Sequence, residues 1–174
     1  LVMLIRLLGM EQAALESNVQ HPYEDAAWAD KYIGYAYQEG LIKGQSDTLF
    51  GTSETASVRD CLTLILRALG YGEDDFLWEE SVAFADSIGL TNGEYTTSSE
   101  FLRYDMALAC YTALTLNLKG TDTTLIEKLY SDGVVSRSAL VSTRLASYAN
   151  IDKTELSAKQ AYEKASFAVF YLEA

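Results

Sequence analysis

The chain has 174 residues, of which 49% are hydrophobic, and its 13 basic and 25 acidic side chains give a formal net charge of −12. This length corresponds to about one domain, and the apolar content suffices for a hydrophobic core, which excludes a disordered chain. The negative charge argues against nucleic acid or an anionic membrane as a partner, because both require a basic surface, but it leaves room for an anionic ligand held by a few arginines.

The first residues, 1–9 (LVMLIRLLG), have the pattern of the last turns of a helix that stops at Gly9. They lack the basic region and the cleavage site of a signal peptide, and no run in the chain approaches the ~20 apolar residues of a membrane span. We therefore expect the chain to begin inside a structural element of a longer protein, with no membrane insertion.

The next helix is predicted within 28–44, WADKYIGYAYQEGLIKG, where apolar residues recur at helical spacing before Gly40. Asp25 is expected to cap its N-terminus. In the following loop, turn-forming residues surround Leu49 and Phe50, which are expected to fold back into the core. The apolar stripe predicted for this helix consists of Trp28, Ala29, Ile33, Ala36 and Tyr37.

A further helix is predicted over 57–69, SVRDCLTLILRAL. Ser57 and Asp60 have the spacing of a capping box, in which each side chain accepts a hydrogen bond from the backbone of the other residue. The apolar residues then recur on one helical face, which predicts that this face is buried. They are Leu62, Ile65, Leu66 and Leu69.

Three segments of the chain repeat one another in pattern. The ending LIRLLG recurs as LILRALG, with the closing glycines, Gly9 and Gly70, 61 residues apart. The segment 76–93 (FLWEESVAFADSIGLTNG) matches 28–44 with a shift of 49 residues, and 102–114 (LRYDMALACYTAL) matches 57–69. We therefore predict helix-loop-helix units. Unit one is represented by its tail at 1–9, unit two covers 25–70, and a degenerate unit three covers 75–117, with Thr97 and Glu100 as its candidate cap.

Beyond Leu118 the pattern changes. A short helix is predicted over 124–130, and the ambiguous residues 134–150 are expected to be helical in part, so that 119–150 forms a helical extension. In the segment 151–174, which is interpreted as a linker or the start of a following domain, a helix is predicted over 157–165 and a strand over 167–173.

At these residues the sequence resembles the S-layer homology (SLH) family, whose repeat is similar to W-A-x-x-x-I-x-x-A-x-x-x-G-L-I-x-G, then a loop aromatic, then T-R-A-E opening a helix that ends L-x-R-x-L-G. The resemblance covers about residues 1–118 and is most specific in unit two. The matching residues are Trp28, Ala29, Ile33, Ala36, Gly40, Leu41, Ile42, Gly44, Phe50, Leu64, Arg67, Leu69 and Gly70.

The resemblance implies an all-α fold of tandem repeats in a pseudo-threefold arrangement. It also implies a secreted, non-catalytic module that holds a protein on the surface of a Gram-positive-type bacterium by binding an anionic, often pyruvylated, cell-wall polysaccharide. In the family the T-R-A-E arginine pairs with that polymer in grooves between repeats. This role suits guanidinium, which recognises carboxylates in a two-pronged geometry.

The arginines of this chain depart from the family pattern. Val58 holds the arginine position in unit two, with Arg59 shifted by one residue, whereas Arg103 is at the family position in unit three. The expected ligand contacts are therefore Arg103 first and Arg59 second, with Trp28 and Tyr32 as groove aromatics. The loss of one arginine leaves open an alternative, in which a degenerate SLH scaffold serves protein interaction.

The tail LSAKQAYEKASFAVFYLEA (156–174) has a fainter resemblance to the lead-in of trypsin-like (HtrA-type) serine protease domains. On the scaffold interpretation, the SLH module would therefore stand next to a catalytic domain whose active residues lie outside this sequence.

No catalytic, cofactor-binding or metal-binding constellation is predicted in the sequence itself. His21 is the single histidine and is interpreted as an exposed or capping residue, because no nucleophile elbow accompanies it. Cys61 and Cys110 are interpreted as buried thiols, with a disulfide between them as the alternative. The acidic segments 72–76 and 120–124 lack the spacing of a calcium loop.

Overall fold

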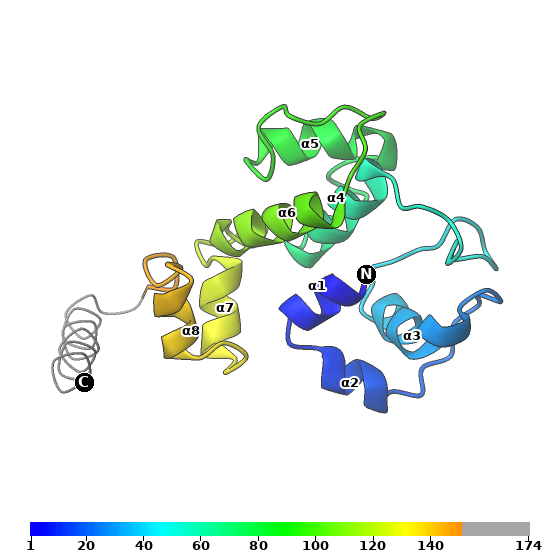
Figure 1. Cartoon of the computed structure of the whole chain (residues 1–174), viewed down its shortest axis with the longest axis horizontal. Coiled ribbons are helices and arrows are strands. Elements are labelled where there is room, and N and C mark those ends of the chain that lie inside the picture. Colours follow the sequence, from blue (N-terminus) through cyan, green and yellow to red (C-terminus); the bar gives the residue numbers. More distant parts are fainter. Residues whose placement is uncertain (151–174) are drawn as a thin grey trace, which may run out of the picture. The chain divides into compact units, whose positions relative to one another are not determined.

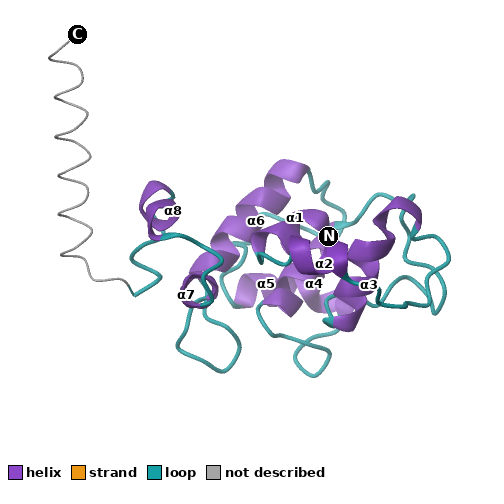
Figure 2. Ribbon diagram, turned by 90° about the horizontal axis from the view of Figure 1, so that it is seen from below, coloured by secondary structure: helices purple, strands orange, loops and turns teal. Residues whose placement is uncertain are grey.

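The structure is a computed structural model that describes residues 1–150, and within these residues the regular elements are helices (Figures 1 and 2). An isolated antiparallel bridge between Asn117 and Thr124 is the only extended pairing in this part of the chain. The all-α fold is therefore confirmed for residues 1–150, whereas the helix and strand predicted within 157–173 lie outside the described residues. The elements are α1 (Val2–Leu7), α2 (Glu11–Glu16), η1 (Ala27–Ala29), α3 (Asp30–Gln38), α4 (Val58–Ala68), η2 (Trp78–Glu80), α5 (Ser81–Ser87), α6 (Arg103–Thr115), α7 (Leu125–Ser131) and α8 (Arg137–Ser142), with η for a 3-10 turn.

The chain divides into two compact units, one of residues 1–125 and one that begins at Ile126 and is described up to residue 150. In the first unit α3 packs on α2 and α1, α5 packs on α4, and α4 and α6 lie against each other. The core lies between these helices, and the predicted buried face of α4 is confirmed. Its members Leu62, Ile65, Leu66 and Leu69 are fully buried, as are Leu4 and Ile5 of α1 and Ile33 and Ala36 of α3.

The segments 28–44 and 76–93 share their local geometry. Each begins with a 3-10 turn, continues as an α-helix and ends at a glycine of positive φ, Gly40 at 70° and Gly89 at 77°. The leucine that follows, Leu41 or Leu90, is buried and donates its N–H to the carbonyl five residues earlier at 2.9 Å. This is the closure expected of a glycine helix end. The pseudo-threefold arrangement of whole repeats stays a prediction.

A carboxylate three residues into the helix caps both α4 and α6. The capping box of α4 is confirmed, because Ser57 N donates to Asp60 Oδ2 at 2.8 Å and Asp60 N donates to Ser57 Oγ at 3.2 Å. In α6, Leu102 N donates to Asp105 Oδ2 at 2.8 Å. The predicted cap at Thr97 is wrong. Residues 96–99 form a turn, and the helix begins where the Asp105 carboxylate can satisfy a free backbone N–H.

The second glycine of the G-L-I-x-G segment, Gly44, is fixed by a close packing contact. Its φ is 68°, and a Cβ there would overlap the ring of Tyr23 and come within 2.8 Å of the Leu49 carbonyl oxygen. Tyr23 is buried, and its ring also contacts Phe50, with centroids 5.9 Å apart. The absence of a side chain at Gly44 thus lets the loop lie directly on Tyr23.

The loop prediction is right for one of its two residues. Phe50 contacts the buried Tyr23 ring, as expected, but Leu49 is 47% exposed. The reason is that the loop turns at these residues. The N–H groups of Gln45 and Ser46 both donate to the Leu49 carbonyl, which leaves the Leu49 side chain on the outside.

The second unit contains α8 and almost all of α7, and it resolves the ambiguity of residues 134–150. The predicted short helix is confirmed as α7, after which Gly133 has a φ of 75° and Val134 N bonds back to Leu129 O at 2.9 Å. Ser136 then caps α8 by accepting the Ala139 N–H. Among the residues described in either unit, no helix is long and apolar enough to cross a membrane.

Candidate functional site

A cavity of about 510 Å³ opens in the first unit, within the size range of small-molecule sites. Its wall is built by α1, the turn η1, the loop 42–56 and residues 60–67 of α4, with one residue each from α3, η2 and α6. The charged and aromatic side chains that define it are Arg6, Trp28, Lys43, Arg67, Trp78 and Arg103.

Two of the four predicted site residues, Trp28 and Arg103, line this cavity although they are 75 positions apart in the sequence. Trp28 was also placed in the apolar stripe of its helix, but it does not lie on the buried side. It is 77% exposed, and Tyr37 is 42% exposed. The buried stripe is narrower because Trp28 lies in the 3-10 turn η1, whose tighter winding changes the direction of its side chain relative to α3.

Tyr32 does not line the cavity but is connected to it through two residues. Its hydroxyl donates to Glu11 Oε1 at 2.7 Å, and the same oxygen accepts from Nε of the cavity residue Arg6 at 2.8 Å. Both bonds lower the pKa of the Glu11 carboxyl, the one from Tyr32 most, and the bond to Glu11 raises the pKa of Tyr32. Tyr32 therefore acts on the cavity by holding Glu11, which orients Arg6.

Arg59 also lies outside the cavity lining, and it contacts a tryptophan that the sequence reasoning missed. Its guanidinium carbon lies 5.0 Å from the ring centroid of Trp78, a cation–π distance. The indole N–H of Trp78 donates to Asp60 Oδ1 at 3.0 Å. Trp78 is thereby held by two neighbouring residues of α4. The signal that could have found it is the match of 76–93 to 28–44, in which its aromatic residue is displaced by one.

The late arginines of two predicted units meet in the same cavity. Arg6 in LIRLLG and Arg67 in LILRALG occupy corresponding positions, and both line the wall. Neither was singled out as a ligand contact, although their common place in the repeated ending was visible. By contrast, Val58, at the family arginine position of unit two, is fully buried, so that position faces the core rather than a ligand.

The cavity is electropositive in an acidic chain. Four basic side chains line it, Arg6, Lys43, Arg67 and Arg103, against the two acidic side chains Glu54 and Asp60. The lining thus carries a formal charge of +2, whereas the chain carries −12. Such local concentration of one sign of charge focuses the electrostatic field and attracts anions.

The basic side chains that line the cavity differ in whether they already pair with a carboxylate of the protein. Arg6 pairs with Glu11 at 2.8 Å and Lys43 with Glu73 at 2.7 Å. Arg103 has no carboxylate within 4.0 Å among the residues that the structure describes. Of these three, Arg103 is therefore the side chain whose donors are most available to an anionic ligand.

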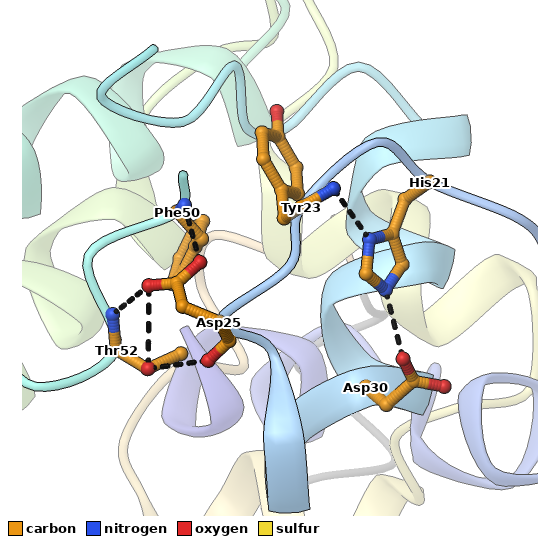
Figure 3. A network of polar contacts seen from close by, with 6 residues as sticks. All are labelled: His21, Tyr23, Asp25, Asp30, Phe50 and Thr52. Carbon is orange, nitrogen blue, oxygen red and sulfur yellow. Dashed lines mark hydrogen bonds and ion pairs between the residues drawn. The ribbon is translucent and has the colours of Figure 1, made fainter. Parts of the chain in front are cut away.

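One wall of the cavity is held in place by Asp25, which was predicted to cap the first helix (Figure 3). That prediction is wrong, because the Asp25 carboxylate instead accepts the N–H groups of Phe50 and Gly51 at 2.7 Å and of Thr52 at 2.9 Å. The Asp25 carboxylate could bond either to the start of the 3-10 turn at Ala27 or to this loop. The loop offers three consecutive backbone N–H donors, which bind an anion better. They lower the pKa of Asp25 from 3.8 to about 2, the Phe50 bond contributing most.

His21 belongs to the same network, with its side chain only 5% exposed. Its Nδ1 accepts the Tyr23 N–H and its Nε2 lies 3.1 Å from Asp30 Oδ1 (Figure 3). The prediction of an exposed histidine is therefore wrong, since a ring with both nitrogens bonded can be buried at low cost. The alternative of a capping residue fits the backbone N–H that the ring accepts. Nowhere in residues 1–150 do three or more His, Cys, Asp or Glu side chains gather as a metal site would require.

The two cysteines are free thiols, Cys61 half-buried and Cys110 buried. This agrees with the interpretation of small hydrophobic residues rather than with the alternative of a disulfide. Burial raises the pKa of both thiols, that of Cys110 to about 11.

Comparison with known proteins finds the S-layer homology domain, whose family model matches residues 23–57. Residues 23–57 are thus similar to an S-layer homology domain and form the S-layer homology segment of the chain. It is also 28% identical over 117 residues to the Middle cell wall protein of Brevibacillus brevis, an alignment that covers 61% of this chain but only 11% of that protein. No solved structure matches the chain.

The S-layer homology segment supplies much of the cavity wall. Trp28, Lys43 and the Asp25-held residues 50–52 all lie within 23–57. The remaining wall comes from α1 before the segment and from α4, η2 and α6 after it. The cavity is therefore completed by residues on both sides of the segment that the family model matches.

Proposed function

We propose that this chain is a non-catalytic anchoring module that binds an anionic cell-wall polysaccharide non-covalently in the cavity. The observation that carries the proposal is the electropositive cavity with two tryptophans in a chain of charge −12. The S-layer homology segment and the similarity to a protein named for the cell wall support the same role. On this proposal the protein is secreted and located at the cell surface of a Gram-positive-type bacterium.

The chemistry of the cavity suits acidic sugars. The Arg103 guanidinium can form two parallel hydrogen bonds with a carboxylate, such as the one that a pyruvyl group adds to a sugar. Trp28 and Trp78 offer aromatic surfaces on which the apolar face of a sugar ring can stack. Both kinds of contact are non-covalent. Arg103, Trp28 and Trp78 would therefore act in binding and not in catalysis.

The experiment that tests the proposal is co-sedimentation of the chain with Gram-positive sacculi, those of Brevibacillus brevis among them, before and after the secondary polysaccharide is removed. We expect binding to intact sacculi and none to stripped ones. Arg103→Ala should weaken binding by about tenfold or more, because a charge-assisted hydrogen bond is worth about 1.5–3 kcal/mol. Arg144→Ala, which removes the same charge outside the cavity lining, is the matched control.

A second candidate function is a scaffold that keeps the S-layer homology fold without its ligand, next to a catalytic domain such as a serine protease. Its support is the loss of the unit-two arginine, since Val58 is fully buried and Arg59 faces Trp78 outside the cavity lining. A well-folded chain that sediments with neither wall would favour this function and refute the anchoring role.

A further inference from the structure

A second hollow of about 350 Å³ lies beside the cavity in the first unit. Lys43 and Arg67 line both spaces, so they form a shared wall. A polysaccharide is a continuous chain, and a sugar bound in the cavity must have neighbours that leave it. The two spaces adjoin at these two polar side chains, which is where such a neighbour would leave the cavity.

The charge of the second hollow differs from that of the cavity. Its basic residues Lys43 and Arg67 are balanced by Glu73 and Asp74, and Lys43 pairs with Glu73 at 2.7 Å. The other lining residues include Gly40 and Gly70, each of which follows the C-cap residue of α3 or α4. The C-terminal ends of helices are electronegative. This hollow therefore does not favour an anion, and its polar wall suits the hydroxyl and amide groups of a neutral sugar.

Arg67 is the residue that connects the two spaces. Its guanidinium is half-buried and donates from Nη1 to the Leu41 carbonyl oxygen at 3.2 Å. It has no carboxylate within 4.0 Å among the described residues, and burial lowers its pKa. A guanidinium has five N–H donors, and the bond to Leu41 uses only one of them. The remaining donors are open to a ligand group at the boundary of the two spaces.

We propose that the second hollow is a subsite for the neutral sugar residue next to the acidic one, with Arg67 donating hydrogen bonds at the junction between them. This inference rests on the proposed function. It predicts that affinity increases with the length of the bound oligosaccharide, and that the increase depends on the second hollow alone.

The test uses oligosaccharides released by partial acid hydrolysis from the polysaccharide of the sacculi that bind best, separated by length and titrated calorimetrically. Gly72→Trp places a large side chain on the lining of the second hollow without backbone strain, because a Cβ at Gly72 meets nothing within 4 Å and its φ is not left-handed. Thr97→Trp, at an exposed position outside both spaces, is the matched control. Circular dichroism and the unfolding midpoint establish that both variants are folded.

We expect the longer fragments to bind the unaltered chain about tenfold more tightly than the shortest ones. Gly72→Trp should lose this gain while binding the shortest fragments as before, and Thr97→Trp should keep both. A gain that survives Gly72→Trp, or affinity independent of length in the unaltered chain, would overturn the subsite and leave the anchoring role standing. Failure of every fragment to bind the unaltered chain would refute the anchoring role and the subsite with it.

Discussion

The clearest stability prediction concerns the pair Gly44→Ala and Gly93→Ala. The two glycines are 49 residues apart, at matching positions in the segments 28–44 and 76–93, and have similar φ values of 68° and 79°. Alanine at either position costs about 1–2 kcal/mol for the left-handed backbone. At Gly93 a Cβ meets nothing within 4 Å, but at Gly44 it overlaps Tyr23 and approaches the Leu49 carbonyl oxygen to 2.8 Å. Forcing a group into packed surroundings adds about 1–3 kcal/mol.

The expected result is a larger loss of stability for Gly44→Ala, with Gly93→Ala measuring the backbone cost alone. At about 4 °C per kcal/mol for a domain of this size, Gly93→Ala should lower the Tm by about 4–8 °C and Gly44→Ala by a further 4–12 °C or so. Thermal unfolding followed by tryptophan fluorescence reports on the first unit, because both tryptophans, Trp28 and Trp78, lie there. Equal shifts for the two variants would refute the packing argument at Tyr23.

Three further predictions follow from the hydrogen-bond network and the buried groups. The folded-state pKa of Asp25, about 2, lies below its ordinary 3.8, so its stabilisation is present above about 3.8 and is lost as the pH falls towards 2. The stability difference between the unaltered chain and Asp25→Asn should therefore shrink as urea unfolding is repeated from about pH 5 down to pH 2, and a constant difference would contradict this assignment. Cys110, whose pKa is raised to about 11, should react with a disulfide reagent near pH 8 only after unfolding; rapid reaction of the native chain would contradict its burial. Tyr32→Phe should weaken binding to sacculi less than Arg103→Ala does, because it only frees Glu11 and Arg6; an equal or larger loss would mean that Tyr32 touches the ligand.

The sequence was sufficient to predict features that depend on neighbouring residues in the chain. The Ser57–Asp60 capping box, the buried face of α4 and the glycine ends of α1, α3, α4 and α5 depend on residues within a few positions of one another. The all-α fold of residues 1–150 follows from the same helical spacing. Trp28 and Arg103, which line the cavity, could be selected in advance only through the resemblance to the S-layer homology repeat, in which they hold matching positions.

The tertiary structure alone decided which side chains meet. Asp25 has the appearance of a helix cap in the sequence, but the three N–H groups that it accepts come from residues 25 to 27 positions later. Trp78 and Arg67 reach one cavity with Arg6 because separate helices bring them there. Sequence spacing predicts the face of a helix on which a residue lies, whereas partners across the fold depend on how those faces pack. The sequence by itself therefore determined the helices, and its family resemblance suggested a ligand, whereas only the packing of the first unit decided which side chains line the cavity.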